Sequence, residues 1–571
     1  MRSPRVFVAG VAIGAILGGA LGAVVIVQHP RFAGHLRSKI ASLQASLLPK
    51  PVPVAEKADV IIVIDDRAGG TAINPLIYGV SFADSTHLQA LKPTSNRWGG
   101  NSASTFNWVN GHAWNAGRDW EFRNNDGGRS GNAVDTFIAE SLGAGAQPLI
   151  TVPTLGWVAR DTDNGHRSVN VPASGGDPIA AGSDAISGYD PAANRARTSV
   201  QSLPSNAAVS SGQPTASGAV VYQDDWIRHL VSQYGSVAAW QRYFAMDNEP
   251  DLWSVTHTDV HPVRMGYQGM VDNFLAYAGA VKAADPSTKV LGPDVSGWTG
   301  YLYSDLDRGG DNFATHADRA AHGNVAFLPW WLSQIAAHDA ATGRRTLDYL
   351  DVHYYPQAAG IDSNANDPAT QALRIRSVRS LYDPNYKDES WIGEPVVLIP
   401  RLKDWIRKNY PGTKLAITEY NWGGEKEASG AVALAEVLGM FGREGVDMAN
   451  YWPYPPLASP AAAAFRLYRN YDGAGASFGD RSLPVTSDRP SVVAFASRHS
   501  DTGTLNLMVA NESLDKPARM HLQLKSGNAR QRHVDVYLLR PGSSTIEHMQ
   551  ASASEVITVP PLGVALVTLA P

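Results

Sequence analysis

The chain has 571 residues, a net charge of −5 and no cysteine, and 44% of its residues are hydrophobic against 18% charged. This length and composition are typical of a globular protein with two or more domains. The lack of cysteine excludes disulfide bonds, thiolate metal sites and cysteine nucleophiles, and the lack of a long basic run argues against a nucleic-acid partner.

The chain begins with an apolar segment. Residues 6–27 carry no charged or polar side chain and follow Arg2 and Arg5, and a run of this length can cross a bilayer as a helix. No small-residue cleavage site follows promptly, so we predict a signal anchor over 1–30 in preference to a cleaved signal peptide. Residues 31–58 are expected to form a linker.

Residues 75–483 alternate short apolar strands with helical stretches, which is the pattern of βα units. Eight strands are expected, at Ile77–Phe82, Ser95–Trp98, Pro148–Val152, Tyr243–Met246, Lys289–Gly292, Leu350–Tyr354, Lys414–Thr418 and Met448–Trp452. Helices are expected between several of them, including Asp224–Tyr234, Gly266–Ala284, Leu328–Thr342 and Gly430–Glu444. Eight such units predict an α/β fold, a (β/α)8 TIM barrel, whose active site lies at the C-terminal ends of the strands. The polar residues 160–220 are expected to form a long loop over the barrel mouth.

The helical pattern disappears after residue 484. Six short strands are expected there, at Val492–Ser497, Thr504–Ala510, Ala518–Leu524, Val534–Leu539, Glu555–Val559 and Val564–Leu569. We therefore predict a C-terminal β-sandwich domain over 484–571. Residues 59–74, which contain the strand-like run Asp59–Ile64, are expected to join it.

Two glutamates stand at the C-terminal ends of predicted barrel strands. Glu249 follows the fourth strand in the run Tyr-Phe-Ala-Met-Asp-Asn-Glu-Pro, and Glu419 closes the seventh in Lys-Leu-Ala-Ile-Thr-Glu-Tyr-Asn-Trp. Glycoside hydrolysis needs two carboxyl groups that flank one bond. Either glutamate alone could be an ordinary loop carboxylate, but a pair on strands four and seven of one barrel is more specific. The pair predicts a glycosidase.

Longer motifs surround these glutamates. They are Asn96–Asn101 (Asn-Arg-Trp-Gly-Gly-Asn), Asp247–Trp253 (Asp-Asn-Glu-Pro-Asp-Leu-Trp), Asp351–Pro356 (Asp-Val-His-Tyr-Tyr-Pro), Thr418–Gly424 (Thr-Glu-Tyr-Asn-Trp-Gly-Gly) and Ser477–Asp480 (Ser-Phe-Gly-Asp). Together they resemble glycoside hydrolase family 44. The resemblance implies a barrel with a β-sandwich, retention of anomeric configuration, and endo-action on β-1,4-glucans such as xyloglucan, soluble cellulose and mixed-linkage glucan. By position it implies that Glu249 is the acid/base and Glu419 the nucleophile.

Four residues are expected to support this pair. An ionised Glu419 needs a cationic or hydrogen-bonding neighbour, for which Arg97, at the end of the second strand, and Tyr355 are the candidates. Asn248 is expected to bind a sugar hydroxyl while the acid beside it protonates the glycosidic oxygen. His353 is expected to orient a carboxylate or a substrate hydroxyl, although a core histidine explains it as well.

Aromatic and metal-type side chains give further predictions. Four tryptophans near the ends of barrel strands are predicted to stack on sugar rings: Trp98, Trp157, Trp422 and Trp452. The alternating His257, Asp259 and His261 could form a metal cluster, but a loop beside the catalytic acid explains them equally, and no metal site is predicted. No cofactor should be required, and a structural calcium in the Asn-rich insertions stays open.

Two alternatives remain at this point. One is another barrel glycosidase with acids on strands four and seven, either exo-acting or arabinose-releasing; the other is a non-catalytic carbohydrate-binding envelope protein, which would be expected to have lost one glutamate. The expected partner is a β-glucan polysaccharide. Because such a polymer is met outside the cell, we expect an extracytoplasmic monomer, secreted or held at the membrane through the N-terminal helix only.

Overall fold

The structure is a computed structural model that describes residues 57–571 except 130, 167, 169–201, 209–219, 236–239, 310, 528–531 and 553–554. In the remaining parts it describes four short strands, Gly14–Ile16 (β1), Ala20–Gly22 (β2), Tyr189–Asp190 (β11) and Arg195–Ala196 (β12). A membrane helix was predicted over 6–27. In that segment the structure describes only the strands β1 and β2, and the other residues lie outside the described ones. Among the helices that are described, none has the length and apolar character needed to span a membrane. Much of the predicted loop 160–220 also lies outside them.

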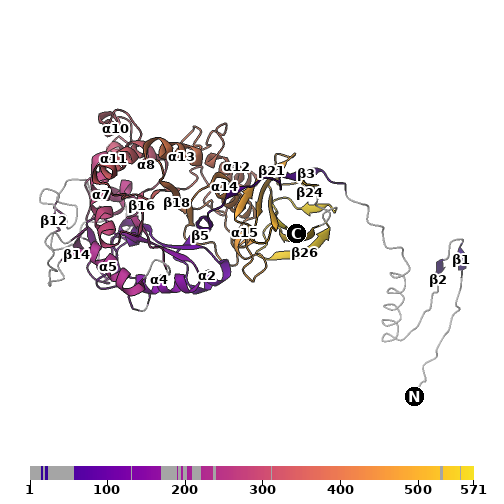
Figure 1. Ribbon diagram of the computed structural model, residues 1–571, viewed down its shortest axis with the longest axis horizontal. Helices are drawn as coiled ribbons and strands as arrows, with labels where there is room; N and C mark the ends of the chain where they lie inside the picture. The colour runs from indigo at the N-terminus through magenta and orange to yellow at the C-terminus, as the bar shows by residue number, and fades with distance from the viewer. Residues whose placement is uncertain are drawn as a thin grey trace, which may run out of the picture. The chain divides into compact units, whose positions relative to one another are not determined.

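Eight parallel strands close into a barrel, so the predicted eight βα units are confirmed. In chain order they are β5 (Gly79–Ser81), β6 (Ser95–Trp98), β9 (Gln147–Val152), β15 (Tyr243–Met246), β16 (Lys289–Val295), β17 (Tyr349–Tyr354), β18 (Lys414–Tyr420) and β19 (Met448–Tyr451). Nearly every residue in them is buried, as parallel strands covered on both faces require. Figure 1 shows helices packed around these strands.

The helices that connect and extend the barrel strands include all four that were predicted, within two residues at each end. They are α2 (Ser85–Leu91), α3 (Gly100–Ala103), α4 (Ala133–Gly143), α5 (Gln223–Tyr234), α6 (Trp253–Thr256), α7 (Tyr267–Ala284), α8 (Trp298–Leu302), α9 (Asp305–Arg308), α10 (Ala317–Ala321), α11 (Phe327–Thr342), α12 (Pro368–Arg376), α13 (Leu398–Asn409), α14 (Ala428–Glu444) and α15 (Pro460–Arg469). Four 3-10 turns accompany them: η1 (Pro75–Ile77), η2 (Gly117–Trp120), η3 (Pro250–Leu252) and η4 (Ser377–Leu381). Small strands outside the barrel are β7 (Ala113–Trp114), β8 (Asn125–Asp126), β10 (Trp157–Ala159), β13 (Ser202–Asn206) and β14 (Val221–Tyr222).

Two sheets form the C-terminal β-region. The larger has the order β26 (Ile546–Ser552), β25 (His533–Leu539), β28 (Val564–Ala570), β23 (Leu505–Asn511), β22 (Val492–Arg498), β20 (Arg481–Leu483) and β4 (Thr71–Ala72). The smaller has the order β21 (Val485–Ser487), β3 (Val60–Ile64), β24 (Ala518–Leu524) and β27 (Ile557–Val559). Apolar side chains from both sheets share one core. Figure 1 shows the indigo strand β3 among the yellow C-terminal strands.

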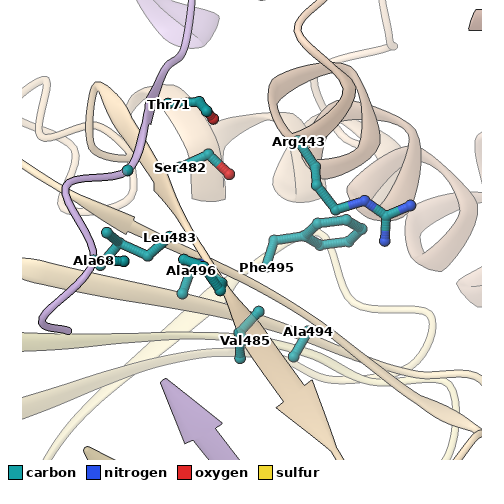
Figure 2. Close-up of a pocket in the computed structure, with 11 residues that line it drawn as sticks. Ala68, Thr71, Arg443, Ser482, Leu483, Val485, Ala494, Phe495 and Ala496 are labelled. Atoms are coloured by element: carbon teal, nitrogen blue, oxygen red, sulfur yellow. The ribbon is translucent and has the colours of Figure 1, made fainter. Parts of the chain in front are cut away.

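Helix α14 joins the barrel to the sandwich and is buried along most of its length. The close approach depends on Gly439, because a Cβ atom at that position would overlap the ring of Phe495 on β22. Beside this contact lies a pocket of about 450 Å³. Figure 2 shows the guanidinium of Arg443 next to the Phe495 ring, whose centroid is 6.0 Å away. The pocket belongs to this joint, because none of the residues around Glu249 and Glu419 lines it.

A carboxyl pair also lies at this joint and gives a stability prediction. Glu436 of α14 is buried and hydrogen-bonded to Glu512, and burial followed by the Glu512 charge raises the pKa of Glu436 well above its usual value. Because the folded pKa exceeds the unfolded one, the native state holds the extra proton, and its stabilising effect is lost as pH rises from about 4.3 through the folded pKa. We expect Glu436→Gln to raise the free energy of unfolding at pH 8 by roughly 1–3 kcal/mol relative to wild type, with a smaller gain at pH 5.

Thermal unfolding of both proteins at the two pH values measures this difference. Glu555→Gln, at an exposed glutamate between β26 and β27, is the matched control and should change neither value. An equal gain for Glu436→Gln at pH 5 and pH 8 would contradict the prediction.

Candidate active site

Glu249 lies just beyond the C-terminal end of β15, in a backbone shaped by its neighbours. Asp247 and Glu249 both adopt left-handed backbone conformations, with φ of 69° and 47°, which cost free energy and are typical of functional sites. The Asp247 carboxylate accepts hydrogen bonds from the backbone N–H groups of Thr154 and Leu155, and the Glu249 N–H donates to the carbonyl of Asp294 at 2.9 Å. The loop after β9 and the strand β16 therefore hold the backbone around Glu249 in place.

Glu419 is the last residue but one of strand β18, and both of its carboxylate oxygens accept hydrogen bonds. Arg97 Nη1 donates to Oε1 at 2.6 Å, and the Tyr355 hydroxyl donates to Oε2 at 2.8 Å. The Arg97 side chain is fully buried and that of Glu419 is 6% exposed. A buried carboxylate with a cation and a hydroxyl donor is stabilised in its ionised form, which is the form that a nucleophile needs.

The two glutamates face each other across a short gap. One carboxylate oxygen of Glu249, one of Glu419 and a ring nitrogen of His353 all lie within 4.8 Å of one another. Retaining glycosidases hold their carboxyl groups about 5–5.5 Å apart, whereas inverting ones leave about 6.5–9.5 Å for a water molecule. The separation therefore fits a retaining pair.

The environment of Glu249 favours a protonated carboxyl group. Burial raises the pKa of Glu249 to about 7, and the Glu419 charge acts in the same direction, against the opposing effect of His353. His353 Nδ1 lies 2.9 Å from Glu249 Oε1 and 3.4 Å from Glu419 Oε2. One carboxyl group is thus held ionised and the other protonated, the division of roles that acid/base glycosidases require.

The side chain of Asn248 links the residue before Glu249 to Arg97 and to the loop after β6. Its Oδ1 accepts hydrogen bonds from Arg97 Nη2 at 3.0 Å and from the Gly100 N–H at 3.1 Å, and its Nδ2 donates to Asn101 at 3.2 Å. The structure therefore brings Arg97, Asn248, His353 and Tyr355 together around the glutamates, at the positions where the sequence places them.

Sequence reasoning missed one residue of this centre, Asp294. It is fully buried, with one carboxylate oxygen 2.5 Å from His353 Nε2 and the other 3.3 Å from Arg97 Nη2. The signal was present, because Asp294 follows the fifth predicted strand at Lys289–Gly292. Strand β16 in fact continues through Pro293 to Val295, which carries the aspartate into the barrel mouth.

Comparison with known proteins identifies the family. The family model of glycoside hydrolase family 44 matches residues 113–358. Endoglucanase A of Paenibacillus lautus is 34% identical in an alignment of 519 positions that covers 85% of this chain and 69% of that one. The chain belongs to glycoside hydrolase family 44. The resemblance read from its motifs is thus confirmed, and the protein is a glycoside hydrolase.

Solved structures of family 44 hydrolases and their relatives share its fold over nearly their whole length. A bifunctional glucanase-xylanase from a metagenome library is 38% identical, with a TM-score of 0.75, over 90% of this chain and 100% of that one. A Paenibacillus polymyxa xyloglucanase of family 44, solved with xyloglucan, is 31% identical, with a TM-score of 0.77, over 90% of this chain and 99% of that one.

The predicted stacking tryptophans of this family 44 hydrolase need correction. Trp98, Trp157 and Trp422 are only 4%, 6% and 2% exposed, so they present no open face to a sugar ring. Trp98 instead packs edge-on against three phenylalanines, Phe82, Phe106 and Phe137. Trp452 is half-buried, with the Arg97 guanidinium 5.6 Å from its ring centroid.

The histidine and aspartate side chains whose alternation could indicate a metal site in this hydrolase do not form one close group in the described part of the chain. His257, Asp259 and His261 form no close group among the described residues; the residues that do are Glu249, His353 and Glu419. Burial lowers the pKa of His257 to about 3, so its ring is neutral, and Asp259 accepts a hydrogen bond from Ser168 at 2.8 Å. The loop interpretation fits these contacts better. A structural calcium stays a prediction.

Proposed function

We propose that this family 44 hydrolase is a retaining, endo-acting enzyme that cleaves β-1,4-glucan-type polysaccharide by double displacement. Glu249 is the acid/base and Glu419 the nucleophile in this proposal. The observation that carries it is that one carboxylate oxygen of Glu249 lies within 4.8 Å of one of Glu419. Glu419 is ion-paired with Arg97, and burial raises the pKa of Glu249 to about 7.

In the first step, Glu249 gives its proton to the glycosidic oxygen while Glu419 attacks the anomeric carbon. The bond between that carbon and the leaving oxygen breaks, and its electron pair goes with the oxygen. The product is a glycosyl ester of Glu419, whose negative charge has disappeared. That loss lowers the pKa of Glu249, because the Glu419 charge was one of the influences raising it.

In the second step, Glu249 acts as the base. It removes a proton from water, the water oxygen attacks the anomeric carbon, and Glu419 leaves as a carboxylate that Arg97 and Tyr355 stabilise. Each displacement inverts the anomeric carbon, so two displacements retain its configuration.

The substrate class rests on the relatives. Their names describe an endoglucanase, a glucanase-xylanase and a xyloglucanase, which supports xyloglucan, soluble cellulose or mixed-linkage glucan as substrate. A product profile on a polysaccharide panel tests the proposal: a ladder of internal fragments from β-1,4-glucans supports it. Release of monosaccharide alone, or of arabinose, would favour the exo-acting or arabinose-releasing alternative.

Two exposed tryptophans are connected to the centre around Glu249 and Glu419, Trp391 by a hydrogen bond of its own ring and Trp120 through the residue before it. Trp391, 62% exposed, donates to Gln357 at 3.3 Å, and Gln357 donates to the carbonyl of Tyr355 at 2.8 Å. Trp120, 48% exposed, follows Asp119, which accepts a hydrogen bond from Asn101. Flat, open indole faces at such positions suit stacking on sugar rings. We propose these two residues, in place of the buried tryptophans, as stacking platforms.

Removing the ring of Trp391 should weaken substrate binding. We expect Trp391→Ala to raise KM for soluble β-glucan about fivefold, from the loss of roughly 1 kcal/mol of ring contact, with kcat little changed. Trp391→Phe keeps an aromatic face and should restore most of the affinity. Steady-state kinetics of the two variants measure this, and equal KM values for Trp391→Ala and wild type would remove Trp391 from the substrate path.

The raised pKa of Glu249 sets the pH dependence. The acid must be protonated for the first step, so kcat/KM should fall about tenfold per pH unit as the pH rises above the Glu249 pKa of about 7. With an aryl glycoside whose leaving group needs no proton, this alkaline decline should disappear. An alkaline decline that is identical for both kinds of substrate would contradict the assignment.

We also propose an extracytoplasmic monomer anchored by residues 6–27, because a polysaccharide substrate lies outside the cell. Cell fractionation and light scattering test the two parts. The full chain should appear in the membrane fraction, and a variant lacking residues 1–58 should be soluble and monomeric. Full-length enzyme in the cytosol, or a dimer, would contradict the corresponding part.

A further inference from the structure

Asp294 lies directly beneath the catalytic centre, at the end of β16. Its backbone is left-handed, with φ of 58°, and its carbonyl accepts the Glu249 N–H at 2.9 Å. Its carboxylate contacts His353 Nε2 at 2.5 Å and Arg97 Nη2 at 3.3 Å. One buried residue thus touches the acid through its backbone and the histidine beside the acid through its side chain.

The short contact favours the assignment of a proton to His353 Nε2. Two groups approach this nitrogen, Asp294 Oδ1 at 2.5 Å and Arg97 Nη2 at 3.3 Å. A guanidinium can only donate, and a carboxylate can only accept. A lone pair on Nε2 would repel the carboxylate at the shorter distance, so Nε2 carries hydrogen and donates it to Asp294.

The other ring nitrogen, Nδ1, faces the catalytic carboxyl groups. Although burial opposes a charged ring, the carboxylates of Glu419 and Asp294 raise the pKa of His353 well above its usual value. Four charged or titratable groups from other elements surround the ring: Asp294 on β16, Glu249 after β15, Glu419 on β18 and Arg97 on β6. Asp351 lies on β17, the strand that also carries His353. The imidazolium form has a second N–H, at Nδ1, which donates to Glu249 Oε1 at 2.9 Å.

We propose that Asp294 is a positioning residue that determines which oxygen of Glu249 carries the catalytic proton. This inference rests on the proposed role of Glu249 as the acid. The imidazolium occupies Oε1 as a donor, so the acidic proton resides on Oε2. During the first step the Oε2–H bond breaks and the proton passes to the glycosidic oxygen. Without the Asp294 charge, Nδ1 would lose its hydrogen and accept the proton of Glu249 at Oε1, turning it away from the substrate.

Asp351 provides a matched control in the same layer of the barrel. It is equally buried, and both of its carboxyl oxygens lie 2.9 Å from the Thr418 hydroxyl, which can donate its one hydrogen to this group. Burial, followed by the Asp294 charge, raises the pKa of Asp351 well above its usual value. Asp351→Asn changes a buried carboxyl group that contacts Thr418, whereas Asp294→Asn changes the carboxylate that contacts His353.

The test compares Asp294→Asn, Asp351→Asn and wild type on aryl β-cello-oligosides with leaving groups of different pKa. For Asp294→Asn, kcat/KM should fall about 10²-fold with a poor leaving group and less than about threefold with dinitrophenolate, which departs without a proton. Asp351→Asn should show no dependence on the leaving group beyond that of wild type. A uniform loss for Asp294→Asn across the series would show a merely structural role and overturn the inference.

Two further measurements keep the outcome decisive. Glu249→Ala should show the same leaving-group dependence as Asp294→Asn. If Glu249→Ala shows none, the assignment of Glu249 as the acid fails. If Glu249→Ala shows it and Asp294→Asn does not, only the role of Asp294 is refuted. Should Asp294→Asn not fold, neutron diffraction on the unmodified enzyme still decides. Deuterium on both His353 nitrogens and on Glu249 Oε2 is expected, and a bare Nδ1 would overturn the inference.

Discussion

Glu419→Gly is expected to lower kcat on β-glucan by roughly 10⁶-fold, the size of loss that follows removal of the nucleophile in other hydrolases. The variant keeps Arg97 and Tyr355, whose donors now face an open space instead of a carboxylate. Azide fits such a space and carries the negative charge that these donors stabilise. With an activated β-glycoside, azide should therefore restore turnover in a single displacement.

The stereochemistry of the azide product identifies the residue that was replaced. One displacement inverts the anomeric carbon, so Glu419→Gly should form an α-glycosyl azide, which NMR spectroscopy identifies directly. A β-azide would mean attack from the opposite face and would exclude Glu419 as the nucleophile. Glu547→Ala, at an exposed glutamate of the sandwich, should keep wild-type activity with and without azide.

Glu249→Ala is expected to lower kcat/KM on β-glucan by about 10³-fold, within the usual range for a general acid. The glycosyl ester of Glu419 still forms when the leaving group needs no proton, but its hydrolysis has lost the base. Azide needs no base and should capture the ester. Because this is the second of two inversions, the product should be a β-glycosyl azide.

The two azide products thus form a pair with opposite configurations. Their combination separates the two roles in a way that activity loss alone does not, since both variants lose most of their activity. An α-azide from Glu249→Ala, or unchanged hydrolysis of polysaccharide by that variant, would contradict the acid/base assignment.

The barrel could be predicted from sequence because its strands are short, apolar and bounded by loop residues. Ser95–Trp98 and Tyr243–Met246 have the predicted bounds. The proposed catalytic pair followed from the same pattern, since a carboxylate at the C-terminal end of a buried barrel strand lies at the mouth of the barrel. The local sequence was sufficient to predict a strand where its own apolar residues and the loop residues at its ends determine its bounds.

The missed elements depend on partners far away in sequence. Strand β26 is polar and mostly exposed, because it is an edge strand held by β25 alone, so it shows no apolar alternation. Asp294 was missed because Gly292-Pro293 reads as the end of a strand, whereas β16 continues beyond it. The position of Trp98 was predictable, but its burial depends on phenylalanines from other elements.

Strand β3 has a consequence for how the chain folds during synthesis. Val60 pairs with Met520, so β3 leaves the ribosome 460 residues before its neighbour β24. At about 5–20 residues per second this wait lasts roughly 25–90 s. The whole barrel emerges before either neighbour of β3, because the first of them, β21, begins only at Val485. A chaperone that covers residues 60–64 should therefore improve the yield of folded enzyme, and a C-terminal truncation before β24 would permanently remove one of the two neighbours of β3.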